Sequence, residues 1–121
     1  MGHPQIFREA IPKETLVRLA EDEFKNMIKF VVDLDRGVIC AGGGLHSDEE
    51  AMLLEDGSRQ ADLWGANFYL DRPYDQRYVY TSMINIRPSD GNTSQAIQSK
   101  DLCQKVKELA ESFFAPFYEK S

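Results

Sequence analysis

Two stretches of the chain alternate between two kinds of position with a period of two, and each is followed closely by a second strand-like segment. The first stretch covers 27–34 and leads through a turn into an apolar segment at 38–41. The second covers 63–70 and leads into 77–87. A period of two places alternate side chains on opposite faces of a strand. Because strands joined by short turns pair antiparallel, the sequence predicts two hairpins in an antiparallel sheet.

Helical spacing of apolar residues flanks the two hairpins. A helix is predicted over 12–23, where Pro12 can open it because the first turn needs no amide donor. The last helix is predicted to begin after Ser99 as its N-cap and to end before Pro116.

A short helix over 48–55 is predicted between the hairpins. Ser47 and Glu50 have the spacing of a capping box, in which each side chain bonds the other residue's backbone amide. We expect Ala51 and Leu54 to face inward.

The resulting order is α-β-β-α-β-β-α, within one domain over 1–121. Adjacent strand pairs separated by helices favour an α+β fold. The sequence therefore predicts an antiparallel four-stranded sheet with helices packed on one face.

Composition excludes several classes of partner. The formal net charge is −6 and the basic residues form no stripe, so nucleic acid is not expected. No apolar run approaches the roughly 20 residues that cross a bilayer, and the N-terminus shows no secretory signal. The chain has two cysteines, too few for a disulfide framework, so reduced thiols and a cytoplasmic location are predicted.

Polar residues gather on one predicted face of the second hairpin. Asn67 and Tyr69 lie on its first strand, Asn85 and Arg87 lie on its second, and Asn92 follows in a polar loop. One interpretation is a binding site in which Arg87 holds an anionic group. The other is that these side chains satisfy one another or the neighbouring loop, as most buried polar groups do.

His46 is the one histidine beyond the N-terminal tail, and acidic residues follow it. A single imidazole with carboxylates on one helical face is a weak ligand set, so neither a metal nor another cofactor is expected. Catalysis by His46 with Glu49, Glu50 or Glu55 stays open as a hydrolase hypothesis. Cys40 lies in an apolar strand, which favours a core role over that of a nucleophile.

Two segments carry a family resemblance. One runs through Gly43-Gly44-Leu45-His46-Ser47-Asp48-Glu49-Glu50 to Leu63-Trp64-Gly65-Ala66-Asn67, and the other is Ser82-Met83-Ile84-Asn85-Ile86-Arg87-Pro88 with Gly91-Asn92 and Ser94 behind it. Together they resemble a small bacterial family of roughly 110-residue proteins catalogued as a domain of unknown function. The resemblance implies a bacterial, stand-alone cytosolic protein and carries no assigned activity.

The function predicted from these features is a small binding or interaction module with a polar site for a small anionic ligand or a partner segment. The candidate ligand-binding residues are Arg87, Asn85, Asn67, Tyr69, Asn92 and His46. The alternative is the hydrolase described above, and the sequence does not decide whether the protein is an enzyme. A homodimer is a further hypothesis, because tyrosines crowd the second hairpin and tyrosine is enriched at interfaces.

Overall fold

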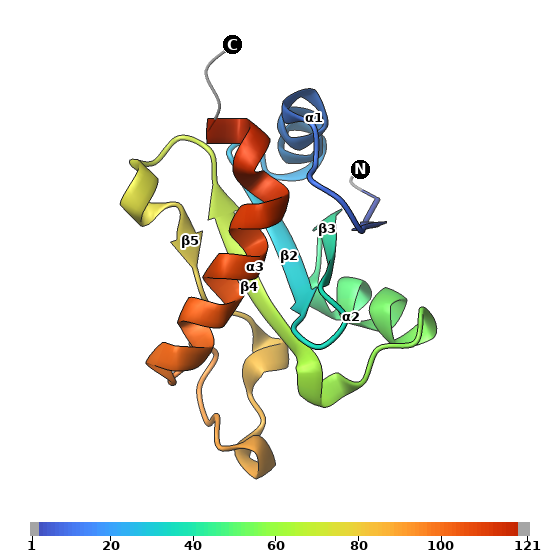
Figure 1. Ribbon diagram of the computed structural model, residues 1–121, viewed down its shortest axis with the longest axis vertical. Helices are drawn as coiled ribbons and strands as arrows, with labels where there is room; N and C mark the ends of the chain where they lie inside the picture. Colours follow the sequence, from blue (N-terminus) through green and yellow to red (C-terminus); the bar gives the residue numbers. More distant parts are fainter. Residues whose placement is uncertain (1–2, 119–121) are drawn as a thin grey trace.

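The computed structural model describes residues 3–118 as a single antiparallel sheet flanked by helices (Figure 1). The α-helices and strands follow one another as β1 (Gln5–Phe7), α1 (Lys13–Glu23), β2 (Met27–Asp33), β3 (Val38–Gly43), α2 (His46–Glu55), β4 (Leu63–Tyr69), β5 (Tyr78–Val79) and α3 (Lys100–Tyr118). Short 3-10 helices cover Gln60–Asp62, Tyr74–Gln76, Met83–Asn85 and Pro88–Asp90. The α+β class and the antiparallel sheet are therefore as predicted.

The sheet has five strands among the described residues, in the order β1-β3-β2-β4-β5, where the sequence predicted four. The additional strand is β1, which pairs with β3 so that Gln5 lies opposite Ala41 and Phe7 opposite Ile39. The predicted order of elements was wrong at this point. β1 is too short to show a period, because three residues give only one and a half repeats.

The two faces of the sheet are covered by different helices, which corrects the prediction that all helices lie on one face. α1 and α3 cover the face on which Phe30 and Phe68 are buried. α2 covers the opposite face, where Leu53 packs with Val31 and Cys40. Figure 1 accordingly shows α3 crossing in front of β2 and β4 with α2 behind the sheet. The face predicted to be open and polar is therefore partly closed.

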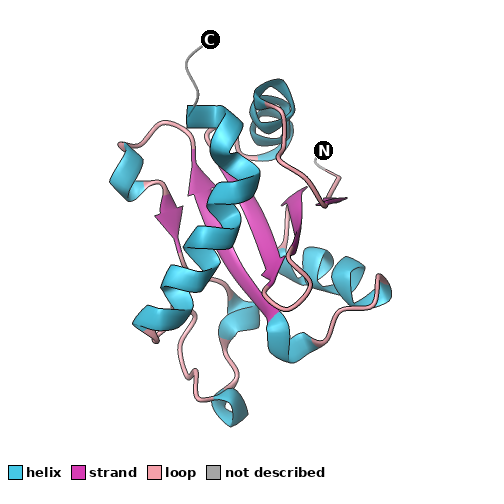
Figure 2. Ribbon diagram, in the orientation of Figure 1, coloured by secondary structure: helices cyan, strands magenta, loops and turns pink. Residues whose placement is uncertain are grey.

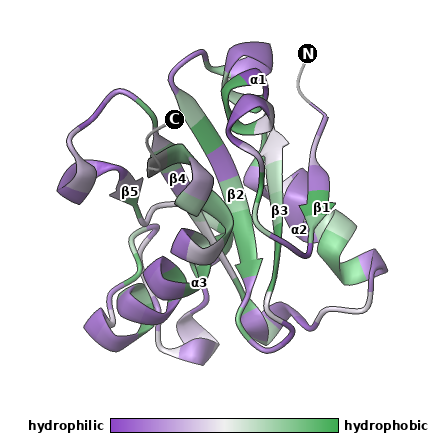
Figure 3. Ribbon diagram, turned by 45° about the horizontal axis from the view of Figure 1, so that its top comes forward, coloured by the Kyte–Doolittle hydropathy of each residue, from purple (hydrophilic) through white to green (hydrophobic). Residues whose placement is uncertain are grey.

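Aromatic rings fill the space between the sheet and α3. Phe68 stacks on Phe114 with the ring centroids 4.5 Å apart, and Phe30 meets Phe114 edge-on at 5.1 Å. Tyr78 packs against Phe68 and lies parallel to Tyr80. Figure 3 shows β2, in the middle of the sheet, coloured as mostly hydrophobic. Two of the clustered tyrosines thus contribute to the core, and the homodimer stays a prediction.

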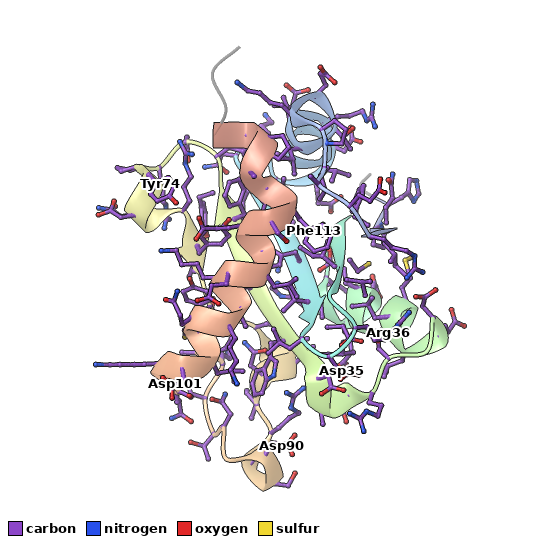
Figure 4. All side chains as sticks on the ribbon, viewed as in Figure 1. Asp35, Arg36, Tyr74, Asp90, Asp101 and Phe113 are labelled. Carbon is purple, nitrogen blue, oxygen red and sulfur yellow. The ribbon has the colours of Figure 1, made fainter. Side chains whose placement is uncertain are left out.

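α3 begins as predicted but continues further. The Ser99 hydroxyl accepts a hydrogen bond from the Leu102 amide at 3.2 Å, the geometry of an N-cap. Pro116 lies inside the helix, which continues to Tyr118, so the predicted end was wrong. Phe113 lies on the side of α3 that faces α1 (Figure 4), and its carbonyl accepts a hydrogen bond from the Ile11 amide. Among the described residues, no helix is both long and apolar enough to span a bilayer.

α2 differs from its prediction in its start and in its buried side. It begins at His46 after Leu45 in the N-cap position, with no side-chain cap, so the predicted capping box does not form. The residues that face inward are His46, Glu49 and Leu53, whereas Leu54 is exposed. The helix therefore buries one imidazole and one carboxyl group that an apolar pattern does not reveal.

The predicted strand over 77–87 is mostly loop. Only Tyr78–Val79 pairs with β4, and a 3-10 helix follows at Met83–Asn85 (Figure 2). The chain turns away from β4, and the Ser82 amide donates to the Gln95 carbonyl at 3.1 Å. The segment 80–97 is therefore a compact loop at the side of β4.

Candidate functional site

Asn85 completes the hydrogen bonding of β4 where β5 has ended. Its Oδ1 accepts from the Gly65 amide at 2.9 Å, and its Nδ2 donates to the Gly65 carbonyl and to the Gln95 carbonyl, both at 3.0 Å. The side chain is fully buried. It thus takes the place of a neighbouring strand's backbone at Gly65 and has a structural role.

Asn92 holds the same loop together from within. Its Nδ2 donates to the Asn85 and Ser94 carbonyls, both at 2.8 Å, and its Oδ1 accepts from the Gln98 amide at 2.9 Å. Because both ends of its amide are engaged with backbone, Asn92 fixes the path of the loop and does not face a ligand.

Arg87 is turned inward, with only 8% of its side chain exposed. Its Nη1 donates to the Gln60 and Leu63 carbonyls at 3.0 and 2.8 Å, and its guanidinium lies 4.0 Å from the centre of the Trp64 ring. Its Nε lies 3.1 Å from Asp90 Oδ2, an ion pair at the loop labelled in Figure 4. These contacts join the loop to the end of β4, while Nε and Nη2 are buried without a hydrogen-bond partner among the described residues. Arg87 does not line the pocket described below.

Tyr69 also lies apart from the other candidates. It is the last residue of β4, and the guanidinium carbon of Arg72 lies 3.7 Å from the centre of its ring. This is a cation–π contact at the turn that follows the strand.

The remaining candidates, His46 and Asn67, line one pocket on the sheet face that carries α2. We call it the Lys29 pocket; its volume is about 270 Å³. Its walls are the start of α2, neighbouring positions of β2 and β4, and the loop after β5. The lining residues are Lys29, Leu45, His46, Ser47, Asn67, Thr81, Ser82, Met83, Ile84 and Gln95.

Gly65 allows this pocket to form beside β4. A β-carbon at Gly65 would lie 2.7 Å from Ser82 Cβ and 3.2 Å from His46 Cδ2, closer than side chains normally approach. The missing side chain therefore lets Ser82 and His46 both pack against the strand.

His46 is a neutral hydrogen-bond donor in this pocket. Its Nε2 lies 2.7 Å from the Ala66 carbonyl oxygen, to which it donates. Burial lowers the pKa of His46 to about 4, although the bond to Ala66 opposes that shift. The imidazole is therefore uncharged at neutral pH, and Nδ1 is left as an acceptor.

Asn67 and Lys29 are two polar residues of the pocket lining. They are directly opposite each other on β4 and β2. Asn67 is 8% exposed and donates through Nδ2 to the Thr81 carbonyl at 3.2 Å, but its Oδ1 is buried and has no partner among the described residues. Lys29 forms no ion pair with any residue in the described part of the chain, and its Nζ lies 5.4 Å from the Phe24 ring centre.

The first turn of α2 adds backbone donors. The first amides that bond back into the helix are those of Asp48 and Glu49, both to the Leu45 carbonyl. Helix geometry leaves the preceding amides, of His46 and Ser47, without an intrahelical acceptor. Both residues line the pocket, so the positive end of the helix dipole lies at its wall.

Comparison with known proteins places the chain in a family. Residues 5–113 match the model of a family described as a protein of unknown function (DUF5674). The chain belongs to this family. The match confirms the resemblance seen in the sequence, and it spans every residue of the Lys29 pocket. No curated protein and no solved structure matches the chain.

In this DUF5674 protein the carboxylates proposed for catalysis lie outside the pocket. Glu49 is fully buried, and its Oε2 accepts from the Gly43 amide at 3.0 Å. Neither Glu49 nor Glu50 nor Glu55 lines the Lys29 pocket, so none is brought beside His46 there. Within residues 3–118, no group of three histidine, cysteine or acidic side chains is arranged to hold a metal ion. The hydrolase stays a prediction.

Sequence reasoning missed Lys29, Ser82 and Met83. Lys29 had a usable signal, because a lysine inside an otherwise apolar central strand needs either a partner or access to water. Ser82 and Met83 gave none, since they lay in a segment that alternates like a strand. Their place in the pocket depends on the loop that replaces that strand.

Proposed function

We propose that this DUF5674 protein binds a small organic anion in the Lys29 pocket. The observation that carries the proposal is that Asn67, whose Oδ1 is buried without a partner among the described residues, lines the same pocket as Lys29. A buried polar atom without a hydrogen bond costs free energy in the free protein. A ligand that donates a hydrogen bond to this atom removes that cost, which contributes to the free energy of binding.

The charges around the pocket support an anion over a neutral or cationic ligand. Lys29 is the only cationic side chain in the lining, which contains no carboxylate. The unbonded amides at the start of α2 favour negative charge in the same place. The protein as a whole is acidic, so this is a local site on a surface that otherwise repels anions.

A thermal-shift screen tests the proposal directly. Wild type, Lys29→Gln and Lys105→Gln are exposed to small organic acids, inorganic phosphate, neutral sugars and amines. A ligand at about 100 times its Kd adds roughly 2.7 kcal/mol to the free energy of unfolding, a shift that is easily measured. Lys105 is exposed on α3 and outside this pocket, so Lys105→Gln makes the same change in net charge as a matched control.

We expect at least one organic acid to stabilise wild type and Lys105→Gln, and to lose most of its effect on Lys29→Gln. Stabilisation by amines or sugars alone, or by acids equally in all three proteins, would contradict the proposal. A binding or interaction module is thus favoured over the hydrolase, for which the lining supplies no carboxylate beside His46.

A further inference from the structure

We infer that the ligand of the Lys29 pocket is a singly charged carboxylic acid that carries a hydrogen-bond donor and an apolar substituent. This inference rests on the proposed function and narrows it to a chemical class. Three features of the pocket define the class: an acceptor without a donor, one uncompensated cation, and an exposed apolar rim.

The acceptor calls for a donor on the ligand. Asn67 directs Nδ2 to the Thr81 carbonyl, which leaves Oδ1 as the unpaired end of the amide. An ionised carboxylate has no hydrogen to give to that oxygen, because it only accepts. A hydroxyl group beside the carboxylate supplies the missing donor without adding a positive charge.

The cation sets the charge of the ligand. Lys29 contributes one positive charge, and the start of α2 contributes about half a charge in addition. His46 contributes none, because it is neutral at physiological pH. A single carboxylate leaves about half a positive charge in this set, whereas a phosphate dianion leaves about half a negative charge. The negative excess is the less favourable of the two in a protein of net charge −6.

The rim accounts for the apolar substituent. Leu45 and Met83 both line the pocket, and their side chains are 57% and 73% exposed. Ile84 lies beside them in the lining and contacts the smaller of the two buried apolar clusters. Two large apolar side chains that line the pocket and are exposed are a surface that an apolar group on the ligand removes from water.

The size of the pocket limits the rest of the molecule. A volume of about 270 Å³ is below the usual range for drug-sized ligands, which starts at about 300 Å³. The ligand is therefore the size of a single amino acid or hydroxy acid.

Calorimetric titration with four probes separates these features. Mandelate has the carboxylate, the hydroxyl and a phenyl group; glycolate lacks the phenyl group; phenylacetate lacks the hydroxyl; inorganic phosphate has neither carboxylate nor apolar part. We expect mandelate to bind at least about tenfold more tightly than glycolate, from burial of the ring. We expect phenylacetate to bind about fivefold more weakly than mandelate, from the lost hydrogen bond.

Two variants locate the apolar contact. Met83→Ser is expected to lower the affinity for mandelate at least about threefold and to leave the affinity for glycolate unchanged. Ile86→Ser is the control, because Ile86 is exposed on the same loop but does not line the pocket. It should change neither affinity.

The outcomes distinguish this inference from the proposed function. If glycolate binds through Lys29 but mandelate is no tighter, or if phosphate is the tightest probe, the ligand class is overturned while anion binding stands. If phenylacetate binds as tightly as mandelate, the inference that the ligand carries a hydrogen-bond donor is overturned. If no probe and no other organic acid binds, both proposals are overturned.

Discussion

Asn85 and Asn67 have the same side chain and lie close to the same strand, yet their surroundings differ. Asn85 pairs both ends of its amide with backbone, including both polar groups of Gly65. Asn67 pairs its Nδ2 and leaves its Oδ1 buried without a partner among the described residues. The free energy of unfolding therefore depends far more on Asn85 than on Asn67. The affinity for the proposed ligand depends on Asn67.

Alanine substitutions at the two positions compare the contributions of Asn85 and Asn67 to the free energy of unfolding. Asn85→Ala leaves the amide and the carbonyl of buried Gly65 without the side chain that pairs them and is expected to lower the free energy of unfolding by about 3 kcal/mol or more. Asn67→Ala removes two long hydrogen bonds to Thr81, of 3.2 and 3.4 Å, together with the unpaired oxygen, and we expect a loss of at most about 1 kcal/mol. Urea denaturation of both variants checks the prediction. Equal losses would mean that Asn67 is as structural as Asn85.

The sequence singled out both asparagines but not their roles. A strand pattern shows which side chains share a face, and it predicted correctly that Asn67 lies on the face opposite Phe68. It does not show which backbone atoms lack a partner, and that is what engages Asn85 and Asn92. The sequence also singled out Arg87 without predicting its role. Its stacking on Trp64 and its hydrogen bonds to backbone carbonyls depend on the path of a loop that has no periodic pattern.

At the scale of elements, the start of α2 matters most for function. The helix begins at His46, two residues before the predicted start, and Leu45 at the N-cap position offers no side-chain acceptor. The amides of the first turn are therefore left for a ligand instead of being capped. α3 is the contrasting case, because Ser99 caps it.

Serine-to-alanine variants compare the two helix starts. Ser99→Ala is expected to cost about 1 kcal/mol of unfolding free energy, the usual effect of losing an N-cap. Ser47→Ala is expected to cost less than about 0.5 kcal/mol, because Ser47 lies inside the helix and caps nothing. Thermal unfolding of the two variants provides the measurement. A larger loss for Ser47→Ala would restore the capping box predicted from the sequence.

Periodicity predicted the elements that packing also requires. The helix over 12–23 and the strands that became β2, β3 and β4 form the centre of the fold, so their patterns reflect burial. The segment 77–87 alternates equally well but leaves the sheet, because its continuation pairs with 95–97. The inward side of α2 was predicted wrongly because two of its three buried residues are His46 and Glu49.

At the scale of the whole molecule, Glu49 makes the free energy of unfolding vary with pH. It is buried between α2 and the sheet, one carboxyl oxygen accepts from Gly43, and the other has no partner among the described residues. Burial raises the pKa of Glu49 well above its ordinary value, although the Gly43 hydrogen bond and Lys29 oppose the shift. The folded protein therefore holds a proton on Glu49 over a pH range in which the unfolded chain releases it.

The sign of this effect is testable with Glu49→Gln. The stability that comes from the neutral carboxyl is complete below the unfolded pKa and is lost as pH rises through the folded pKa. Glutamine has no proton to lose, so Glu49→Gln should gain stability relative to wild type as pH rises, by up to about 1.4 kcal/mol per pH unit. Urea denaturation between roughly pH 5 and pH 9 gives the comparison. Glu55→Gln, at the exposed end of α2, makes the same change in composition and serves as the matched control.

The measurement that tests the central claim most directly is an amide NMR titration of the wild-type protein with mandelate. Binding in the Lys29 pocket predicts that the largest shift changes fall on the backbone amides of His46 and Ser47 and on the side-chain amide of Asn67, and that Lys29→Gln abolishes them. Changes centred on Arg87 and its loop, or no change at saturating mandelate and glycolate, would contradict the account.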